Sequence, residues 1–267
     1  MELVGDLTMP WLESISITWV LLFTFVLARI GGLIMTVPVF TGTEVPIQVR
    51  GLLAVAMTLV LTPTQWGVRI PAPGGVVDYV ILMAGEVLIG MILGLGIVIL
   101  LSGMQVAGQV IAQMSGMALA EVLAPGSDDQ VPLFSGMLNM TATAVFVVIG
   151  GHRALIDGLL HSFTTMPIGQ GGGSASMAQA ALNLLSGSFF LAVRAAAPAM
   201  IALLLATLVL GLIGRTLPQL NILVLGFGIN CLVVLSTLSV SIGAVAILVS
   251  DYFQPALQSL LEAISRH

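Results

Sequence analysis

Four charged residues interrupt otherwise apolar stretches of the sequence, and they are the first candidates for chemistry. They are Arg29, Glu86, Arg194 and Arg215. A charge inside a membrane-spanning helix costs about 2.5–3.5 kcal/mol on insertion scales, so each needs a partner or a function. The functional interpretation is an ion or substrate pathway. The structural one is a salt bridge between helices or subunits, or a helix outside the lipid. Because no carboxylate cluster resembles a proton relay, we expect structural buried charges.

Metal binding and catalysis find little support in the sequence. Asp157 and His161 are one helical turn apart, and His152 shares a broad face with them only if the helix is unbroken. Nothing else supplies ligands at the usual spacing, so we expect no metal. No nucleophile elbow or triad context accompanies the serines and histidines. The absence of lysine excludes a Walker A loop and Schiff-base chemistry. We therefore predict neither an enzyme nor a bound cofactor.

Residues 104–124 differ in kind from the apolar runs around them. Gln105, Gln109 and Gln113 recur at intervals of four residues and so share one helical face. Two interpretations stay open: the stripe faces a water-filled or protein-lined path, or it bonds to neighbouring helices. The segment also holds the methionines Met104, Met114 and Met117. Methionine is adaptable enough to seal a pore against varied cargo, although isolated methionines are more often core residues.

The composition says what kind of element must position these residues. Of 267 residues, 58% are hydrophobic and 7% are charged, whereas a soluble domain carries about 25% charged residues. Lipid or other apolar protein therefore surrounds most of the chain. A net charge of −5 without a basic cluster argues against nucleic-acid binding. Cys231 lies alone in an apolar run, which predicts an unpaired, inert thiol.

Several apolar runs approach or exceed the roughly 20 residues that a membrane-spanning helix needs. The expected helical runs are residues 15–37, 49–62, 76–106, 131–150, 177–213 and 220–249. Within the third run, Gly90 and Gly94 form a G-x-x-x-G step. Such a step allows close helix packing but is also common in membrane helices generally. The sequence thus predicts an all-α, polytopic membrane protein built of helical hairpins.

Glycine and proline mark the internal organisation. Prolines break the first third into short helices, and Ala124-Pro125-Gly126 begins a polar turn. Residues 169–174 are the most glycine-rich stretch, and we place the main boundary there. Residues 1–170 then form one helical part, and residues 176–267 form a hairpin of two long helices that turns at Leu217-Pro218-Gln219.

Ordered motifs along the whole chain resemble the family of the flagellar biosynthetic protein FliR and its virulence-secretion relatives. Each motif is weak alone, but their order and spacing are specific. The matching stretches are Arg29-Ile30-Gly31-Gly32, Val37-Pro38-Val39-Phe40, Val45-Pro46 with Arg50, Gly85-Glu86-Val87-Leu88-Ile89-Gly90, Ala107-Gly108-Gln109 through Ala124-Pro125-Gly126, Gly150-Gly151-His152, Ser162-Phe163, Pro167-Ile168-Gly169, Gly211-Leu212-Ile213-Gly214-Arg215 and Pro218-Gln219-Leu220-Asn221-Ile222.

This resemblance implies a channel-forming, gating subunit of a type III protein export gate in the bacterial inner membrane, at the flagellar basal body. Family members are single copies in a shallow helical assembly with several P-type and Q-type subunits, beside B-type and A-type export apparatus proteins. They pass unfolded protein substrates and do no bond chemistry. Residues 1–170 would resemble a P subunit and residues 176–267 a Q subunit. In such an assembly the four charges would be buried in protein.

The resemblance also implies a plug loop that closes the resting channel, at about residues 107–124. We expect the backbone to bend back there rather than continue a spanning helix. The plug residues of this chain would be Gly108, Gln109, Gln113, Met114, Gly116, Met117, Pro125 and Gly126. The family usually has Glu at the position of Gln109 and Asp at that of Ala124, so contacts made by those carboxylates cannot be transferred.

Two other functions remain as alternatives. The first is the injectisome counterpart of the same subunit, which the sequence does not separate from a flagellar one. The second is a polytopic solute transporter, with helices broken at Pro198 and Pro218 and with Arg194 or Glu86 contacting the solute. We see no two halves with matching breaks, as inverted repeats would require.

Overall fold

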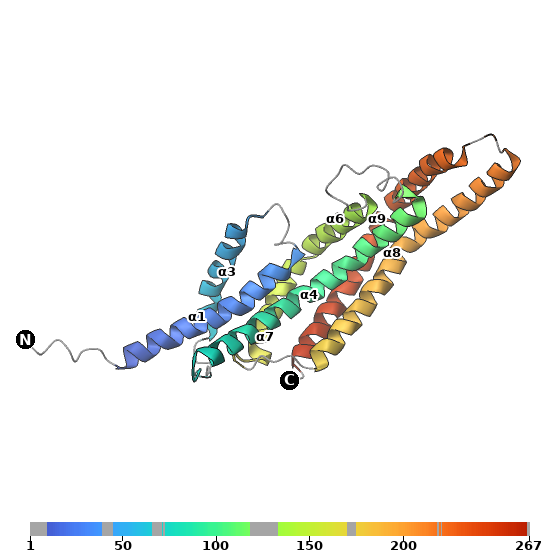
Figure 1. Ribbon diagram of the computed structural model, residues 1–267. Coiled ribbons are helices and arrows are strands. Elements are labelled where there is room, and N and C mark those ends of the chain that lie inside the picture. Colours follow the sequence, from blue (N-terminus) through green and yellow to red (C-terminus); the bar gives the residue numbers. More distant parts are fainter. Residues whose placement is uncertain are drawn as a thin grey trace, which may run out of the picture. The chain divides into compact units, whose positions relative to one another are not determined.

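Every regular element in the part of the chain that the structure describes is helical, which confirms the predicted all-α class. The computed structural model describes residues 10–38, 45–65, 73–117, 133–169, 175–217 and 221–265, together with Pro71 and Gln219. The α-helices and one short 3-10 helix (η1) follow the chain in this order: α1 Pro10–Thr36, α3 Ile47–Leu61, η1 Thr62–Gln65, α4 Val76–Ser115, α6 Leu133–Val148, α7 Gly151–Thr165, α8 Ala175–Thr216 and α9 Ile222–Ser265 (Figure 1).

Proline and glycine set several helix boundaries. Pro10 begins α1, where a missing N–H removes no helical hydrogen bond, and Pro46 immediately precedes α3. Gly150, with φ of +79°, separates α6 from α7, and the two helices are bent by 65° at this break. Gly116, with φ of +81°, follows the last residue of α4. Both glycines occupy the left-handed region, which a Cβ would disfavour.

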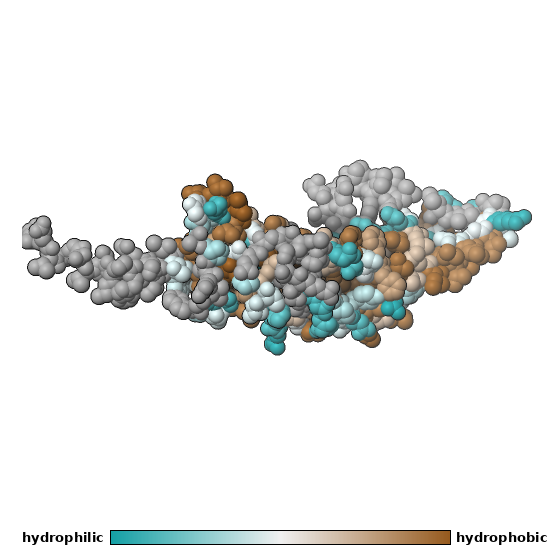
Figure 2. Space-filling view, turned by 90° about the horizontal axis from the view of Figure 1, so that it is seen from below, coloured by the Kyte–Doolittle hydropathy of each residue, from teal (hydrophilic) through white to brown (hydrophobic). Residues whose placement is uncertain are grey.

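Among the described residues, five helices are long and apolar enough to cross a membrane, or six if the bent pair of α6 and α7 counts as one span. Only 22% of the residues in the most apolar stretch of α8, and 17% of those in α9, are buried. Most of the surface of these two helices must therefore meet lipid or other protein. Hydrophobic side chains also gather on the outer face of α3, where Leu52 and Val60 are each 72% exposed (Figure 2).

Contacts divide the chain into two compact units. Unit 1 comprises residues 1–98, 153–181 and 257–267. Within it, α3 packs against α1. Its buried core comes from α1, the first half of α4 and α7, through Phe25, Val26, Ile30, Ile34, Ile89, Leu93, Leu159 and Phe163.

Glycines bring α1 and α4 very close together in unit 1. A Cβ on Gly90 would overlap the carbonyl oxygen of Arg29, and one on Gly94 would overlap the Thr36 hydroxyl. On the α1 side, a Cβ on Gly32 would overlap the Val87 carbonyl oxygen. The G-x-x-x-G step therefore serves close helix packing here, which was one of the two interpretations left open by the sequence.

Unit 2 comprises residues 99–152 and 182–256. In its core the rings of Phe146 and Phe253 meet edge to face, with 5.1 Å between centroids. The parts of α8 and α9 within the unit run side by side, and the rings of Phe190 and Tyr252 lie 6.1 Å apart across them (Figure 1). A Cβ on Gly103 would overlap the Ser188 carbonyl, so α4 also packs closely against α8.

Two differences from the sequence-based predictions bear on the functional site. The helix expected to end at residue 106 continues to Ser115, so the glutamine-rich segment begins as the last turns of α4. Residues 151–165 were not among the predicted apolar runs, yet they form α7. This helix buries only one stripe, Leu155, Leu159 and Phe163, so its sequence shows no continuous apolar run.

Candidate functional site

Two places in the described chain combine polar chemistry with burial: a charge cluster in unit 1 and the C-terminal end of α4 in unit 2. In the first, Arg29 of α1 and Glu86 of α4 form an ion pair, with 2.6 Å between Arg29 Nε and Glu86 Oε2. Both side chains are 0% exposed. The close approach of the two helices at Gly32 and Gly90 allows these charges to meet.

The end of α7 and the turn after it provide hydrogen-bond partners for the remaining polar atoms of Arg29 and Glu86. Arg29 Nη1 donates to the Ser162 carbonyl at 3.0 Å and to its hydroxyl at 3.2 Å, and both Nη atoms donate to the Met166 carbonyl at 3.2 Å. Glu86 Oε1 accepts a hydrogen bond from the Gly169 N–H at 2.8 Å. The guanidinium also lies 4.3 Å from the centroid of the Phe163 ring.

Arg29 thereby caps the carbonyl end of α7, and Glu86 holds the turn that follows. Helix C-terminal carbonyls lack intrahelical partners and favour a nearby cation, so a guanidinium suits this position. Gly169 has φ of +84°, and a Cβ there would overlap the Pro71 ring. Since all these partners are groups of unit 1, the geometry favours a structural role for the pair over an ion pathway.

The other two charges singled out by the sequence lie on the outside of this chain. Arg194 of α8 is exposed and lies 5.3 Å from the centroid of the Phe190 ring. Arg215, in the last turn of α8, is also exposed. Their expected burial concerns contact with other subunits, so it stays a prediction.

At the second place, the end of α4 has one buried face and one exposed polar face. Met104, Ala107, Ile111 and Ala112 are each at most 1% exposed. Gln109 and Gln113 are exposed, and Gln105 is half-buried. No side-chain hydrogen bond joins Gln109 or Gln113 to the described part of the chain, so these two exposed side chains face away from its described helices.

Two of the expected plug glycines have different roles. A Cβ on Gly108 would overlap the backbone of Ser135, and the Ser135 hydroxyl donates to the Gln105 carbonyl at 2.9 Å. Gly108 therefore brings α4 and α6 together, and the backbone bend expected there is absent because α4 continues through it. The helix instead ends at Gly116, whose N–H donates to the Gln113 carbonyl at 3.2 Å.

The remaining plug residues are only partly described. Met114 and Met117 are half-buried at the end of the segment that the structure describes. Residues 118–124, Pro125 and Gly126 lie outside the described residues, so their role stays a prediction.

His152, Asp157 and His161 do lie on one helix, α7, but Asp157 and His161 are exposed while His152 is half-buried. No group of three His, Cys, Asp or Glu side chains in the described segments is placed to hold a metal ion. Sequence reasoning did not assign roles to Ser162, Met166 and Gly169, although two of the motif stretches contain Ser162 and Gly169. The motifs could have pointed to the cluster, but not to its partners.

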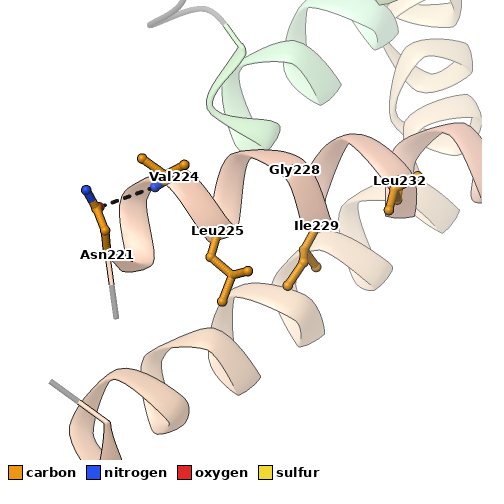
Figure 3. Close-up of a pocket in the computed structure, with 6 residues that line it drawn as sticks. All are labelled: Asn221, Val224, Leu225, Gly228, Ile229 and Leu232. Carbon is orange, nitrogen blue, oxygen red and sulfur yellow. Dashed lines mark hydrogen bonds between the residues drawn. The ribbon is translucent and has the colours of Figure 1, made fainter. Parts of the chain in front are cut away.

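One shallow groove of about 400 Å³ lies on the first turns of α9. Its walls are almost entirely apolar, with Leu225 and Ile229 directed toward α8 (Figure 3). The Val224 N–H donates to Asn221 Oδ1 at 3.4 Å, so Asn221 caps the start of the helix. The groove offers no catalytic or charged group.

Comparisons with known proteins agree with the resemblance carried by the motifs. The family model described as bacterial export proteins, family 1, matches residues 20–256. The flagellar biosynthetic protein FliR of Escherichia coli (strain K12) is 29% identical over 250 residues, covering 93% of this chain and 95% of that protein. FliR of Pectobacterium carotovorum is 30% identical, covering 94% and 95%. The Yop proteins translocation protein T of Yersinia pestis is 30% identical over 152 residues, covering 56% of this chain and 58% of that protein.

Proposed function

The chain belongs to family 1 of the bacterial export proteins, and from this premise we propose that it is a channel-forming, gating subunit of the flagellar type III protein export apparatus. It passes unfolded substrates across the bacterial inner membrane at the flagellar basal body. It does so without bond chemistry of its own, with energy from the proton gradient and partner proteins. The partners are P-type and Q-type gate subunits and the B-type and A-type export apparatus proteins.

The observation that supports the gating role is that the end of α4 has one buried apolar face and one exposed polar face. A membrane helix whose outer surface met only lipid would not present two glutamine side chains there, because unpaired amides are costly in hydrocarbon. Gln109 and Gln113 therefore face water or polar groups of a neighbouring subunit. The helix then stops at Gly116, and half-buried Met114 and Met117 lie beside that stop. Flexible thioether side chains suit a seal that cargo must displace.

The two-part organisation belongs to the same proposal. Residues 1–170, with the plug segment 107–124, correspond to a P-type subunit, and residues 176–267 correspond to a Q-type hairpin. The exposed apolar surfaces of α8 and α9 then face neighbouring subunits. Arg194 and Arg215 on α8 find carboxylate partners there, because an exposed guanidinium on an apolar helix would otherwise remain unpaired.

The test is a short deletion that spares the core of the helix. Removing residues 116–120 leaves the buried residues Ile111, Ala112 and Ser115 in place, so assembly with the co-expressed P- and Q-type subunits should persist. The resting complex should then conduct small ions. The measurement is single-channel conductance of purified complexes in planar bilayers, with osmotic sensitivity of the expressing cells as a second readout.

A deletion of equal length elsewhere provides the matched control. Residues 170–174 form the glycine-rich connection before α8, and their removal should give an assembled complex that stays closed. If the 116–120 deletion assembles and remains as tight as the intact complex, the segment is packing and the gate lies elsewhere.

The flagellar assignment is favoured over the injectisome alternative by coverage. The FliR proteins of Escherichia coli and Pectobacterium carotovorum match 93% and 94% of this chain, whereas the Yersinia protein matches 56%. Export of flagellar substrates in a motility complementation assay distinguishes the two. The solute-transporter alternative loses its main support, because α8 continues through Pro198 without a break. Pro218, the other expected break, lies outside the described residues.

A further inference from the structure

We propose that Asn230 of α9 is a positioning residue that holds the end of α4 in its closed position. This inference rests on the proposed gate, because it concerns how that gate stays shut. Asn230 lies inside α9, in a stretch from residue 220 to 249 without a single charged residue. Its side chain is nevertheless buried, with 7% of the residue exposed. An amide in such surroundings needs a reason to be there.

The contact of Asn230 is with the last residue of α4. Asn230 Nδ2 donates to the Ser115 carbonyl oxygen at 3.4 Å. Ser115 is 1% exposed, and its carbonyl is one of the four at a helix end that have no partner within the helix. Asn230 thus supplies from another helix the hydrogen bond that α4 cannot make for itself. Both residues belong to unit 2.

The position of this contact matters because it is next to the residue at which α4 ends. Gly116 follows Ser115 directly and has a φ of +81°, and no described atom lies within 4 Å of the position that a Cβ would take there. On the other side, Ser115 is held to its own helix by its hydroxyl, which donates to the Ala112 carbonyl at 3.0 Å. The Asn230 contact therefore anchors the last residue of α4, directly before Gly116.

The contact is also weak enough to be released. Its length of 3.4 Å is at the long end for a hydrogen bond, and Asn230 Oδ1, although buried, has no partner among the described residues. A buried, half-satisfied amide loses less when water reaches it than a fully bonded one does. Water entering an opened channel could bond to Oδ1, to Nδ2 and to the Ser115 carbonyl together. The contact between Asn230 and Ser115 then holds the end of α4 while water is excluded, and it can be released once water enters.

The test removes the hydrogen bond while keeping the branched shape and the number of heavy atoms of the side chain. Asn230→Leu should raise the resting ion conductance of the complex with its P- and Q-type subunits by about fivefold, the open-population change expected for one net hydrogen bond. Asn221→Leu provides the matched control, because it makes the same chemical change at an exposed position just before α9, where it removes a helix cap but no contact with Ser115. That variant should conduct like the intact complex, with conductance normalised to recovered complex.

Each result decides between the claims. A leak from Asn230→Leu without one from Asn221→Leu supports the positioning role. A tight Asn230→Leu complex beside a leaking 116–120 deletion overturns the role of Asn230 and leaves the gate in place. If both are tight, the gate proposal fails as well. Should Asn230→Leu not assemble, Asn230→Ser takes its place, and failure of both to assemble would make Asn230 a folding residue and overturn the inference.

Discussion

The charge cluster of unit 1 and the end of α4 in unit 2 use polar groups in opposite ways. Arg29 and Glu86 are completely buried, and each is bonded both to the other and to the backbone of the α7 end or the following turn. At the end of α4, Asn230 donates one long hydrogen bond to the Ser115 carbonyl, and its buried Oδ1 has no partner in the segments that the structure describes. In the first arrangement both charged side chains have several partners within unit 1.

This difference indicates which contacts can separate at low energetic cost in each unit. Separating Arg29 from Glu86 would leave a charge in an apolar interior, which is among the most costly changes that a protein can undergo. Releasing Ser115 from Asn230 would lose one weak bond between neutral groups. We infer that the charge cluster keeps unit 1 in one rigid arrangement, whereas within unit 2 the end of α4 is the part suited to move.

The largest effect is expected from breaking the ion pair. Glu86→Gln leaves the Arg29 guanidinium buried and unpaired, and should lower the free energy of unfolding by about 3–5 kcal/mol. The measurement is denaturation of the purified complex in detergent, together with its yield. Asp78→Asn, an exposed position on the same helix, is the matched control and should cost less than about 1 kcal/mol. An unchanged Glu86→Gln complex would remove the basis for calling unit 1 rigid.

An intermediate effect is expected from adding one methyl group at helix crossings. In unit 1, Gly32→Ala should lower the free energy of unfolding by about 1–3 kcal/mol, because the Cβ would overlap the Val87 carbonyl. Gly31→Ala has open space and should be neutral or slightly stabilising, since alanine favours helix. Thermal unfolding of the purified complexes measures both.

The same pair of changes in unit 2 sharpens the comparison. A Cβ on Gly108 would overlap Ser135, whereas Gly136 has open space. If the helices of unit 2 can shift apart more easily, Gly108→Ala should lower the free energy of unfolding less than Gly32→Ala does, each measured against its own control. Equal losses would mean that the two units are similarly stiff at their helix crossings.

The smallest effect is expected from the hydroxyl that joins α6 to α4. Ser135→Ala removes the hydrogen bond to the Gln105 carbonyl and should lower the free energy of unfolding by about 1 kcal/mol. Because Gln105 lies well before the end of α4, the resting conductance should not change. A leak from Ser135→Ala would show that any loosening of α4 opens the channel, and would remove the special position of Asn230.

Much of the fold could be predicted because apolar length alone specifies a membrane helix. The runs at 15–37, 76–106 and 177–213 correspond to α1, α4 and α8, with ends that shift by several residues. α7 was missed because an amphipathic helix shows only a stripe. Arg29 and Glu86 were marked as anomalies by their surroundings, but nothing in the sequence paired them, since they are 57 positions apart. Asn230 had no marker at all, being one neutral amide among apolar residues.

Composition and periodicity are properties of short stretches, so the sequence by itself determined the solvent of the chain, its helical class and which polar residues would be costly. Hydrophobic transfer acts on each segment separately and needs no knowledge of its neighbours. Which polar groups meet depends instead on how helices far apart in the sequence cross. The crossing is decided at close backbone contacts, such as those of Gly32 with Val87 and of Gly90 with Arg29. Only the tertiary structure therefore brought Arg29 to Glu86 and to the end of α7, and Asn230 to the last residue of α4.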